Sequence, residues 1–548
     1  FSFDIQFTCT FLFMVIVMYK KLFAIKLVER QSKRYNFLTK TLHQMKLYTA
    51  SETRRIDNLA IKEKNITGFS LMQSAAEFSL DVIVREFPEV KDLIVFCSKG
   101  KNSGDGFLLG TYAKDFGLNV IVVMCSPVND FKSVTKKAYD ELKSAKVKVI
   151  KSPDLKNLKL SRDTVIVDAL VGTGLKGKLR NSVKESVLKI NELGLKYPVI
   201  SLDVPSGMNS DTGYVEDVCV FADITATFVA QKRGCFTTIG KKVSGEVQYS
   251  DLDIPKKLFS KVASSCSVIN FEGLISKVIY REENAHKGVF GHAIIVGGDK
   301  GLGGAGILSS KAAIYCGVGL ASLATRPEHV GASLISCPEV MVKGINSGQD
   351  VEEHLVKPNV IAIGPGLGQS AWSEQMVQRV FMEAETRNVP VIMDADALNL
   401  LAKLKLSNKL PKQLILTPHP GEAATLLNTT IAEIESDRFS AAEKIHKKYK
   451  ATVVLKGSGT IIFHNDKSVQ KWGLCSSGNP GMATGGMGDV LTGIIAGILA
   501  QGLNIRDAVE AAVDLHAKSA DLMSSEVGEV GLTPSDVIEG LRFLLRYD

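Results

Sequence analysis

The chain has 548 residues, of which 45% are hydrophobic and 23% are charged. This composition is typical of globular domains with large apolar cores, and it excludes a disordered or fibrous chain. The net charge is +8, but residues 1–46 hold eight basic and two acidic side chains, so that leader carries +6 and the remainder only +2, which argues against a nucleic-acid-binding protein.

The start of the chain does not fit a membrane anchor. The apolar run Phe11–Tyr19 is followed by Lys20 and Lys21, and it is shorter than the about 20 residues that span a bilayer. It also lacks the flanking pattern of a signal peptide. We therefore expect residues 1–45 to be a leader without a structural role, Met45 to be a natural start, and no membrane to be a partner.

The nine cysteines are scattered and form no C-x-x-C pair. This spacing favours small buried thiols in a reducing compartment over a disulfide framework or a zinc site. A cytoplasmic location is therefore expected.

Residues 46–258 alternate short apolar runs with amphipathic helical stretches. The runs predict strands at 93–97, 120–124, 165–167, 199–202 and 226–229. Continuous apolar strands that alternate with helices are typical of a parallel sheet covered on both faces. The fold class expected for this half is a Rossmann-like α/β domain.

Three predicted strand ends of this half carry polar side chains beside glycine turns. Ser98–Gly106 precedes a helix predicted from Phe107, Asp168 ends the next strand, and Asp203 and Ser206 follow the third. The carboxyl ends of such strands converge on one crevice. Asn102, Asp168 and Ser206 offer hard oxygen donors that suit an alkali or alkaline-earth cation, and Asp203 is a candidate acid or base. Alternatively, each aspartate only caps a turn.

This half resembles the NAD(P)H-hydrate epimerase domain in GFSLMQSAA (68–76), KNSGDG (101–106), VDALVGTGL (167–175), LDVPSG (202–207) and residues 223–232. The resemblance implies that Asn102, Asp168 and Ser206 hold K⁺ and that Asp203 lies near the chemistry and the substrate. It also implies that substrate phosphates are bound by Lys101, Asn102, Ser103, Gly104, Asp105, Gly172, Thr173, Gly174, Leu175, Lys176, Gly177 and Lys178. The family usually has Asn-Asn-Gly-Gly-Asp-Gly at 101–106. Lys101 could add a phosphate contact, and Ser103 would be strained if its φ were positive.

The strand–helix rhythm breaks at residues 259–285, which we interpret as a junction. A second series then predicts strands at 293–296, 321–324, 360–363, 391–393, 414–416, 452–455 and 460–463, with helices from Val490 onward. Residues 286–548 are thus expected to form a second α/β domain.

The strongest local pattern of the second half is NPGMATGGMGD (479–489) before the apolar helix predicted at 490–501. Glycines before a helix let backbone N–H groups converge on an anion, which the helix dipole also favours. Asp489 could accept a proton from a hydroxyl while that anion hole neutralises a phosphoryl group. Alternatively, Asp489 is only an N-cap.

Three further glycine-rich segments lie beside predicted strands. Lys456–Thr460 joins two strands and could hold a nucleotide, although Gly-Ser-Gly is equally good chemistry for a β-hairpin turn. Residues 297–306 and 364–368 each follow an apolar strand, where ligands of open α/β sheets bind. Neither matches the P-loop or Rossmann consensus.

The second half resembles the ribokinase-like superfamily and, within it, the ADP/ATP-dependent NAD(P)H-hydrate dehydratases. The matching segments are KGVFGH (287–292), GGDKGLGGAG (297–306), GPGLG (364–368), DADALN (394–399), LTPHPGE (416–422), KGSGT (456–460) and NPGMATGGMGD. The resemblance implies that the hydrated dinucleotide contacts Ala305, Gly366, His419 and Asp489. It implies that the adenine nucleotide contacts Lys456, Gly457, Ser458, Gly459, Thr460 and Gly488.

The two resemblances together imply a repair enzyme for hydrated NADH and NADPH. The first half would interconvert the epimers, and the second would dehydrate one of them with Mg²⁺ and ADP or ATP as phosphoryl donor. Fusions of this type resemble ADP-using enzymes, so ADP is expected, as is a homo-oligomer. The alternative is a small-molecule kinase, for a vitamin precursor or a sugar, whose first half is a ligand-sensing module, because the superfamily also includes kinases.

Overall fold

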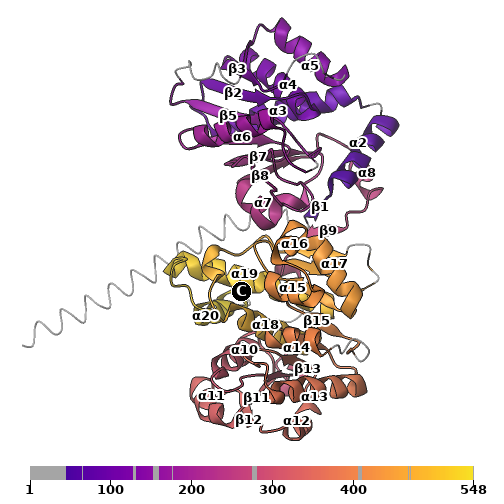
Figure 1. Cartoon of the computed structure of the whole chain (residues 1–548), viewed down its shortest axis with the longest axis vertical. Coiled ribbons are helices and arrows are strands. Elements are labelled where there is room, and N and C mark those ends of the chain that lie inside the picture. The colour runs from indigo at the N-terminus through magenta and orange to yellow at the C-terminus, as the bar shows by residue number, and fades with distance from the viewer. Residues whose placement is uncertain are drawn as a thin grey trace, which may run out of the picture. The chain divides into compact units, whose positions relative to one another are not determined.

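The computed structural model describes residues 45–546 except 65, 127–130, 132, 152–159, 176, 275–280, 405–409, 467, 469 and 470. The predictions for residues 1–44 and for Lys176 lie outside the described residues. Lys46–Asp548 cluster into one compact part of the chain, which contains two sheets (Figure 1).

The first sheet is entirely parallel, in the order β4-β3-β2-β5-β6-β7-β8. Its strands are β2 (Asp92–Cys97), β3 (Asn119–Met124), β4 (Lys148–Lys151), β5 (Thr164–Ala169), β6 (Val199–Leu202), β7 (Ile224–Phe228) and β8 (Glu246–Ser250). Leu93, Val95 and Cys97 of β2 join the core on one face, and Ile94 and Phe96 join the core on the other. Burial on both faces is the reason that this strand is a continuous apolar run.

Helices cover both faces of this sheet (Figure 1). They are α2 (Ala50–Lys64), α3 (Gly68–Glu86), α4 (Lys101–Asp115), α5 (Ser133–Ser144), α6 (Asn181–Gly194), η3 (Arg233–Phe236), α7 (Thr238–Val243) and α8 (Lys256–Ser260). The strand order reverses between β2 and β5, which is where a doubly wound sheet opens a ligand crevice.

The second sheet has the order β1-β9-β18-β17-β16-β15-β14-β13-β10-β11-β12. In this sheet the neighbouring strands from β12 across to β16 are all parallel. Strand β17 is antiparallel to β16, β18 is antiparallel to β17, and β9 is parallel to β18. The strands are β1 (Lys46–Leu47), β9 (Cys266–Val268), β10 (His292–Val296), β11 (Leu320–Thr325), β12 (Met341–Gly344), β13 (Val360–Ile363), β14 (Val391–Met393), β15 (Leu414–Leu416), β16 (Thr452–Leu455), β17 (Ile461–Phe463) and β18 (Trp472–Leu474).

The helices of the second half alternate with its parallel strands. They are η4 (Lys287–Phe290), α10 (Gly303–Tyr315), η5 (Pro327–His329), α11 (Val330–Ser336), α12 (Gly348–Leu355), α13 (Ala371–Arg387), α14 (Asp396–Lys403), α15 (Pro420–Leu427), α16 (Ile431–Ser436), α17 (Arg438–Tyr449), η6 (Pro480–Met482), α18 (Met487–Ala500), α19 (Ile505–Val527) and α20 (Pro534–Leu544).

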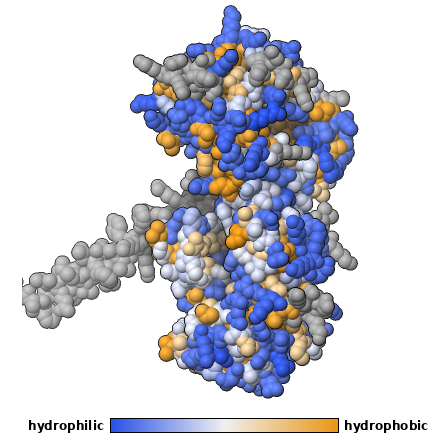
Figure 2. All heavy atoms as spheres, viewed as in Figure 1, coloured by the Kyte–Doolittle hydropathy of each residue, from blue (hydrophilic) through white to orange (hydrophobic). Residues whose placement is uncertain are grey.

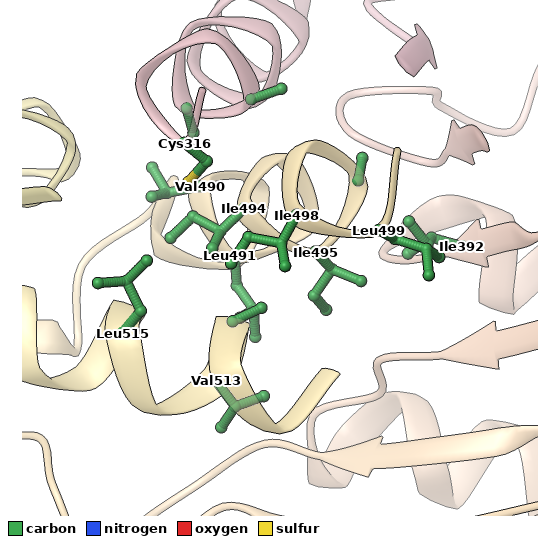
Figure 3. Close-up of a cluster of buried hydrophobic side chains, with 14 of the residues drawn as sticks. Cys316, Ile392, Val490, Leu491, Ile494, Ile495, Ile498, Leu499, Val513 and Leu515 are labelled. Carbon is green, nitrogen blue, oxygen red and sulfur yellow. The ribbon is translucent and has the colours of Figure 1, made fainter. Parts of the chain in front are cut away.

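Helix α18 is the centre of the core beneath the second sheet. Val490, Leu491, Ile494, Ile495 and Ile498 are buried, and they lie between α10, α19 and β14 (Figure 3). A helix that is apolar on nearly every side is stable only when it is covered on every side. This burial fixes the N-terminus of α18, and with it the glycine-rich segment before the helix.

All twelve predicted strands are confirmed within a few residues, and the predicted parallel α/β class is confirmed. Six further strands were not predicted from the sequence: β1, β4, β8, β9, β12 and β18. Strand β9 lies inside residues 259–285, the predicted junction, and β1 pairs with it.

The surface of the described residues mixes polar and apolar side chains. Figure 2 shows hydrophobic residues scattered among hydrophilic ones on the face in view. Among the described residues, no helix is long and apolar enough to cross a membrane. The eight described cysteines are free thiols, and all but Cys125 are buried.

Candidate functional site

The first candidate site is a cavity of about 690 Å³ at the carboxyl ends of the first sheet. The segments after β2, β5, β6 and β7 line it, and α2 and α3 contribute further lining residues. The strand ends that carry polar side chains therefore converge on one cavity, as predicted, and the strand order reverses between β2 and β5 beside it.

Lys101, Asn102 and Asp105 line this cavity, whereas Ser103 and Gly104 are buried and do not line it, and the segment forms no loop. Helix α4 begins at Lys101, so the expectation that it starts at Phe107 is wrong. Its N-cap, Gly100, supplies no side-chain bond to the first N–H groups, which leaves them available to a phosphate. Ser103 has no positive φ; its hydroxyl accepts from Ser98 N at 2.7 Å and donates to Ala169 O at 2.8 Å. Ser103, which stands where the family usually has glycine, therefore links α4 to the loop after β5 without backbone strain.

Asp168 and Ser206 are brought together beneath this helix. The Asp168 carboxylate is fully buried and accepts from Ser206 N at 2.8 Å and from Ser206 Oγ at 2.6 Å. It also accepts from Ser201 Oγ at 2.9 Å and from Leu170 N at 3.2 Å. Burial raises the pKa of Asp168, and these hydrogen bonds oppose that rise.

Asn102 is the third predicted cation ligand, and its side-chain amide has no partner. Both polar atoms are buried without a hydrogen bond, although buried polar groups are nearly always satisfied. A Cβ at Gly172 would lie 3.5 Å from Asn102 Oδ1 and 2.8 Å from Asp203 Oδ2. Residue 172 is therefore packed so closely against both side chains that it has no room for one of its own.

Asp203 stands at the end of β6 in a strained conformation. Its φ is +67°, which is unusual for a residue other than glycine and is found mainly at functional sites. Its Oδ2 accepts from Thr173 N at 3.2 Å, and its Oδ1 forms an ion pair with Lys232. The loops after β5, β6 and β7 thus meet at this carboxylate.

Two further carboxylates face the same cavity. Burial raises the pKa of Asp57, and Asp203 raises it further while Lys232 and Lys101 lower it. Burial also raises the pKa of Asp105 well above its usual range, and Asp203 and Asp57 add to that rise. No role was predicted for Asp57 or for Lys232, although Lys232 lies in the segment 223–232 that resembles the epimerase domain.

The second candidate site lies at the carboxyl ends of the second sheet, where the strand order reverses between β10 and β13. A Cβ at Gly366 (φ +58°) would lie 3.0 Å from Ala305 Cβ and 2.4 Å from Leu302 O. The fold therefore brings together Ala305 and Gly366, which the resemblance places on the substrate.

Asp489 lies in the first turn of α18 and is not its N-cap. The helix begins at Met487, and its N-cap is Gly486, with φ +95° and no side-chain cap bond. The start predicted at Val490 is therefore wrong, and so is the N-cap alternative for Asp489. Burial raises the pKa of Asp489 to about 7, and Asp394 contributes to the rise. A half-buried carboxyl of this kind is suited to exchange a proton near neutral pH.

Lys456 anchors a buried charge cluster beside Asp489. Its Nζ lies 2.6 Å from Asp394 Oδ1 and 3.7 Å from Glu422 Oε2, and Thr492 donates to Asp394 Oδ2 at 2.9 Å. Burial alone would lower the pKa of Lys456, but the two carboxylates outweigh it and raise that pKa. Burial raises the pKa of Glu422 to about 7. Asp394 and Glu422 were within recognised motifs but had received no role.

Gly488 lies directly against this cluster. A Cβ at residue 488 would be 3.3 Å from Lys456 Nζ and 3.4 Å from Asp394 Oδ2. The first turn of α18 and Lys456, both predicted to hold the nucleotide, therefore converge.

Residues 456–460 do connect an antiparallel pair, β16 and β17, as the hairpin alternative required. The turn is also firmly held, because Arg438, 1% exposed, donates to Ser458 O at 2.9 Å and to Leu455 O at 2.9 Å. Thr237 Oγ1 donates to Gly459 O at 2.9 Å. A turn fixed in this way is compatible with both a hairpin and a ligand site.

His419 is the N-cap of α15. Its Nδ1 accepts from Gly421 N at 3.0 Å, and Glu422 Oε2 accepts from His419 N at 2.7 Å. Burial lowers the pKa of His419, and Lys456 lowers it further. The imidazole thus has a structural role, while its Nε2 lies 3.3 Å from Glu422 Oε1 on a ring that is 56% exposed.

Comparison with known proteins gives the two halves separate family matches. Residues 68–234 match the model described as YjeF-related protein N-terminus. Residues 293–542 match the model described as NAD(P)H-hydrate dehydratase. An ADP/ATP-dependent NAD(P)H-hydrate dehydratase structure from Bacillus subtilis, co-crystallised with ATP and Mg²⁺, is 29% identical, with a TM-score of 0.44, and covers 50% of this chain and 96% of that one.

Two relatives match over nearly their full length. The bifunctional NAD(P)H-hydrate repair enzyme Nnr of Coxiella burnetii is 38% identical over 499 residues, which cover 91% of this chain and 99% of that protein. The Escherichia coli protein of the same name is 33% identical over 503 residues, covering 90% and 93%. Both family regions occur here in one chain, with the YjeF-related region first. The chain belongs to the family of bifunctional NAD(P)H-hydrate repair enzymes.

Proposed function

We propose that this chain repairs hydrated NADH and NADPH at two separate sites. The cavity of the first sheet interconverts the two epimers at C6 of the hydrated nicotinamide, and the site at α18 dehydrates one of them. The observation that carries the proposal is Asp489, a half-buried carboxyl in the first turn of a helix whose N–H groups have no side-chain cap, beside Lys456. That combination suits transfer of a phosphoryl group to a hydroxyl.

In the second site, Asp489 accepts the proton of the C6 hydroxyl as its oxygen attacks the terminal phosphorus of the nucleotide. The N–H groups at the start of α18 and the Lys456 ammonium stabilise the charge on the phosphoryl group. Phosphate then leaves with the C6–O electron pair, and loss of a proton from C5 restores the C5–C6 double bond. The result is NADH or NADPH, the nucleotide product and inorganic phosphate.

Residues 456–460 and Gly488 are proposed to hold ADP, or ATP in its place. Mg²⁺ fits this site as an ion carried mainly by phosphates, because Mg²⁺ typically binds one or two carboxylates plus substrate phosphates. The described residues contain no cluster of three or more His, Cys, Asp or Glu side chains that could hold a metal, and the Asp394 carboxylate is already taken by Lys456 and Thr492. When bound, Mg²⁺ would supply charge neutralisation on the nucleotide.

In the first site, Asp203 is proposed to serve as the base for epimerisation. The hydrated ring carries a hydroxyl on C6 beside the ring nitrogen N1. Removal of the hydroxyl proton lets the C6–N1 bond break and leaves an aldehyde, and closure onto its other face gives the second epimer. The N-terminus of α4 and the loop 172–178 are proposed to hold the phosphates.

Potassium fits the residues proposed for it. Asn102 Oδ1 is buried and unpartnered, so a cation beside it would supply the partner that it lacks, and the fully buried Asp168 would supply negative charge. With Ser206 they form a set of hard oxygen donors, and no nitrogen or sulfur ligand is among them. K⁺ would supply positive charge that holds the loops after β5 and β6 together around the substrate.

A small-molecule kinase is the competing interpretation, and product analysis separates the two. Purified full-length protein is given each separated epimer with ADP and then with ATP, and reduced-nicotinamide absorbance and phosphate are followed. We expect one epimer to yield NADH and phosphate in equal amounts, and the other to do so only after epimerisation. A phosphorylated product that accumulates without NADH would support the kinase. The choice of ADP or ATP, a homo-oligomeric state and a cytoplasmic location remain predictions.

A further inference from the structure

The first site contains more acid–base chemistry than the proposed base requires. Three carboxyl groups, Asp57, Asp105 and Asp203, line one cavity together with the buried ammonium of Lys232. Opening the hydrated nicotinamide ring at its C6–N1 bond requires a group that accepts the proton of the C6 hydroxyl and a group that donates a proton to N1. Two groups in opposite protonation states are therefore needed. The arrangement of these side chains indicates which group has which role.

The Lys232 ammonium forms an ion pair with Asp203. The side chain is 1% exposed, and besides the ion pair with Asp203 it donates to Phe228 O at 2.7 Å and to Thr227 Oγ1 at 3.1 Å. These three contacts use the donors of an ammonium group. The ion pair therefore places a buried positive charge directly against the Asp203 carboxylate and fixes the position of that carboxylate.

Asp57, in contrast to Asp203, forms no ion pair with a lysine among the described residues. It projects from α2 into the cavity, one helical turn from Thr53 and from Ile61, which also line it. Its Oδ1 is buried and has no hydrogen-bond partner. Burial raises the pKa of Asp57 more than the nearby lysines lower it. A half-buried carboxyl whose buried oxygen has no partner and no contacting cation holds its proton more tightly than a free aspartate.

We propose that Asp57 is the proton donor of the epimerase site and that Lys232 is the positioning residue that holds Asp203 as the base. This inference rests on the proposed epimerase function. Asp203 accepts the proton from the C6 hydroxyl, the C6–O bond becomes a carbonyl, and the C6–N1 electron pair moves to N1. Asp57 delivers its proton to N1. After rotation about C5–C6, N1 attacks the other face of C6, its proton returns to Asp57, and the oxygen recovers the proton from Asp203.

The experiment compares Asp57→Asn with Asp81→Asn, the same chemical change at an exposed position of α3 in the same domain. Epimer interconversion is measured as kcat and KM from acidic to alkaline pH, and dehydration of the substrate epimer in the same preparation reports folding. For Asp57→Asn we expect kcat to fall by at least about 10²-fold with KM changed by less than about threefold, because general acid catalysis contributes about 10²–10⁴. Asp81→Asn and the dehydratase readout should match the parent chain.

The pH profile gives a readout that a structural role would not change. Epimerisation by the parent chain should decline as the pH rises through the raised pKa of Asp57 and the donor loses its proton, and Asp57→Asn should abolish that decline. The charged groups that face Asp57 are Asp105 and Lys101 of α4, Asp203 after β6 and Lys232 after β7. Asp105→Asn is therefore measured in parallel. If the decline survives in Asp57→Asn and disappears in Asp105→Asn, Asp105 is the donor and the proposal is wrong.

Lys232→Met tests the positioning residue. Loss of the ammonium removes the ion pair that holds the Asp203 carboxylate in place, so epimerase kcat should fall by about tenfold or more while KM changes by less than about threefold. Epimerisation with a normal kcat in Lys232→Met would overturn the role of Lys232. If the parent chain itself does not interconvert the epimers, the proposed function fails; if the parent does so and Asp57→Asn is equally active, only this inference fails.

Discussion

Both sheets place a site where their strand order reverses, between β2 and β5 in the first and between β10 and β13 in the second. The two sites differ in their charge. The first gathers three carboxyl groups around a cavity with one ammonium committed to Asp203. The second sets an uncapped helix N-terminus beside a lysine that two carboxylates share. The same position in the two sheets therefore carries different charged groups: a cluster of carboxyl groups in the first site and a helix N-terminus beside a lysine in the second.

The largest effect is expected for Asp489→Asn. An amide cannot accept the hydroxyl proton, so dehydratase kcat should fall by about 10²-fold or more. Nucleotide affinity should change little, because Lys456 and Arg438 still hold the turn at 456–460. Phosphate release and nucleotide binding are measured on one preparation, with epimerisation as the control that stays unchanged. Turnover close to that of the parent chain would refute the catalytic assignment.

Asp168→Asn should break the first site and leave the second intact. An asparagine amide does not carry the negative charge that a cation ligand needs. Its NH₂ group would also face hydrogen-bond donors such as Ser206 N, from which it cannot accept a hydrogen bond. Loss of charged hydrogen bonds of this kind costs about 1.5–3 kcal/mol, which predicts about a 10- to 150-fold slower epimerisation. Stimulation by K⁺ should disappear as well. The measurement is epimer interconversion in K⁺ and in choline chloride. A variant that keeps its K⁺ response would argue against Asp168 as a ligand.

Gly172→Ala tests the same separation of the epimerase and dehydratase sites, with a smaller expected effect. The added Cβ would lie 2.8 Å from Asp203 Oδ2, and crowding of this size costs about 1–3 kcal/mol. We expect epimerisation to fall about tenfold while dehydration continues. Gly273→Ala is the matched control, because a Cβ there meets nothing within 4 Å. Equal epimerase rates for the two variants would contradict the close packing at Asp203.

The smallest effect is the pH dependence of dehydration. The pKa of Asp489 is raised to about 7, chiefly by burial, and the base acts only when ionised. The value of kcat/KM for dehydration should therefore rise with pH, reach half its maximum near pH 7, and fall about tenfold for each unit below that. Initial rates with the substrate epimer across pH 5.5–9 provide the measurement. A flat profile between pH 6 and 8 would exclude Asp489 as the titrating base.

The sequence predicted the parallel strands because each is a continuous apolar run that only two-sided burial explains. The missed strands differ in pattern or length. Strand β4 has the burial pattern exposed, intermediate, intermediate, exposed, and β1 has only two residues. Strand β9 is a three-residue strand whose partner β18 lies about 200 residues along the chain. Because the two strands are so far apart in the chain, no local sequence pattern indicates that they pair.

The candidate sites were predictable where a motif supplies the residues, as at Asp168, Asp203, Lys456 and Asp489. Lys232 lies in the segment 223–232 that resembles the epimerase domain, but that segment alone did not indicate its role, and Asp57 lies outside the matching segments. Lys232 lies 29 residues beyond Asp203 along the chain, and Asp57 belongs to a helix that precedes the sheet. Their roles depend on which carboxylate receives the ammonium, and only the folded arrangement determines that.

Strand β9 has a consequence for dividing the chain into separately produced fragments. It covers one edge of β18, whose other edge pairs with β17. A fragment that starts at residue 286 would lack β9 and would expose the backbone of Trp472–Leu474 as an open strand edge. Unpaired edges of this kind recruit other chains and promote aggregation. A fragment for crystallisation or calorimetry is therefore better begun upstream of Cys266, so that the strand remains part of the material under study.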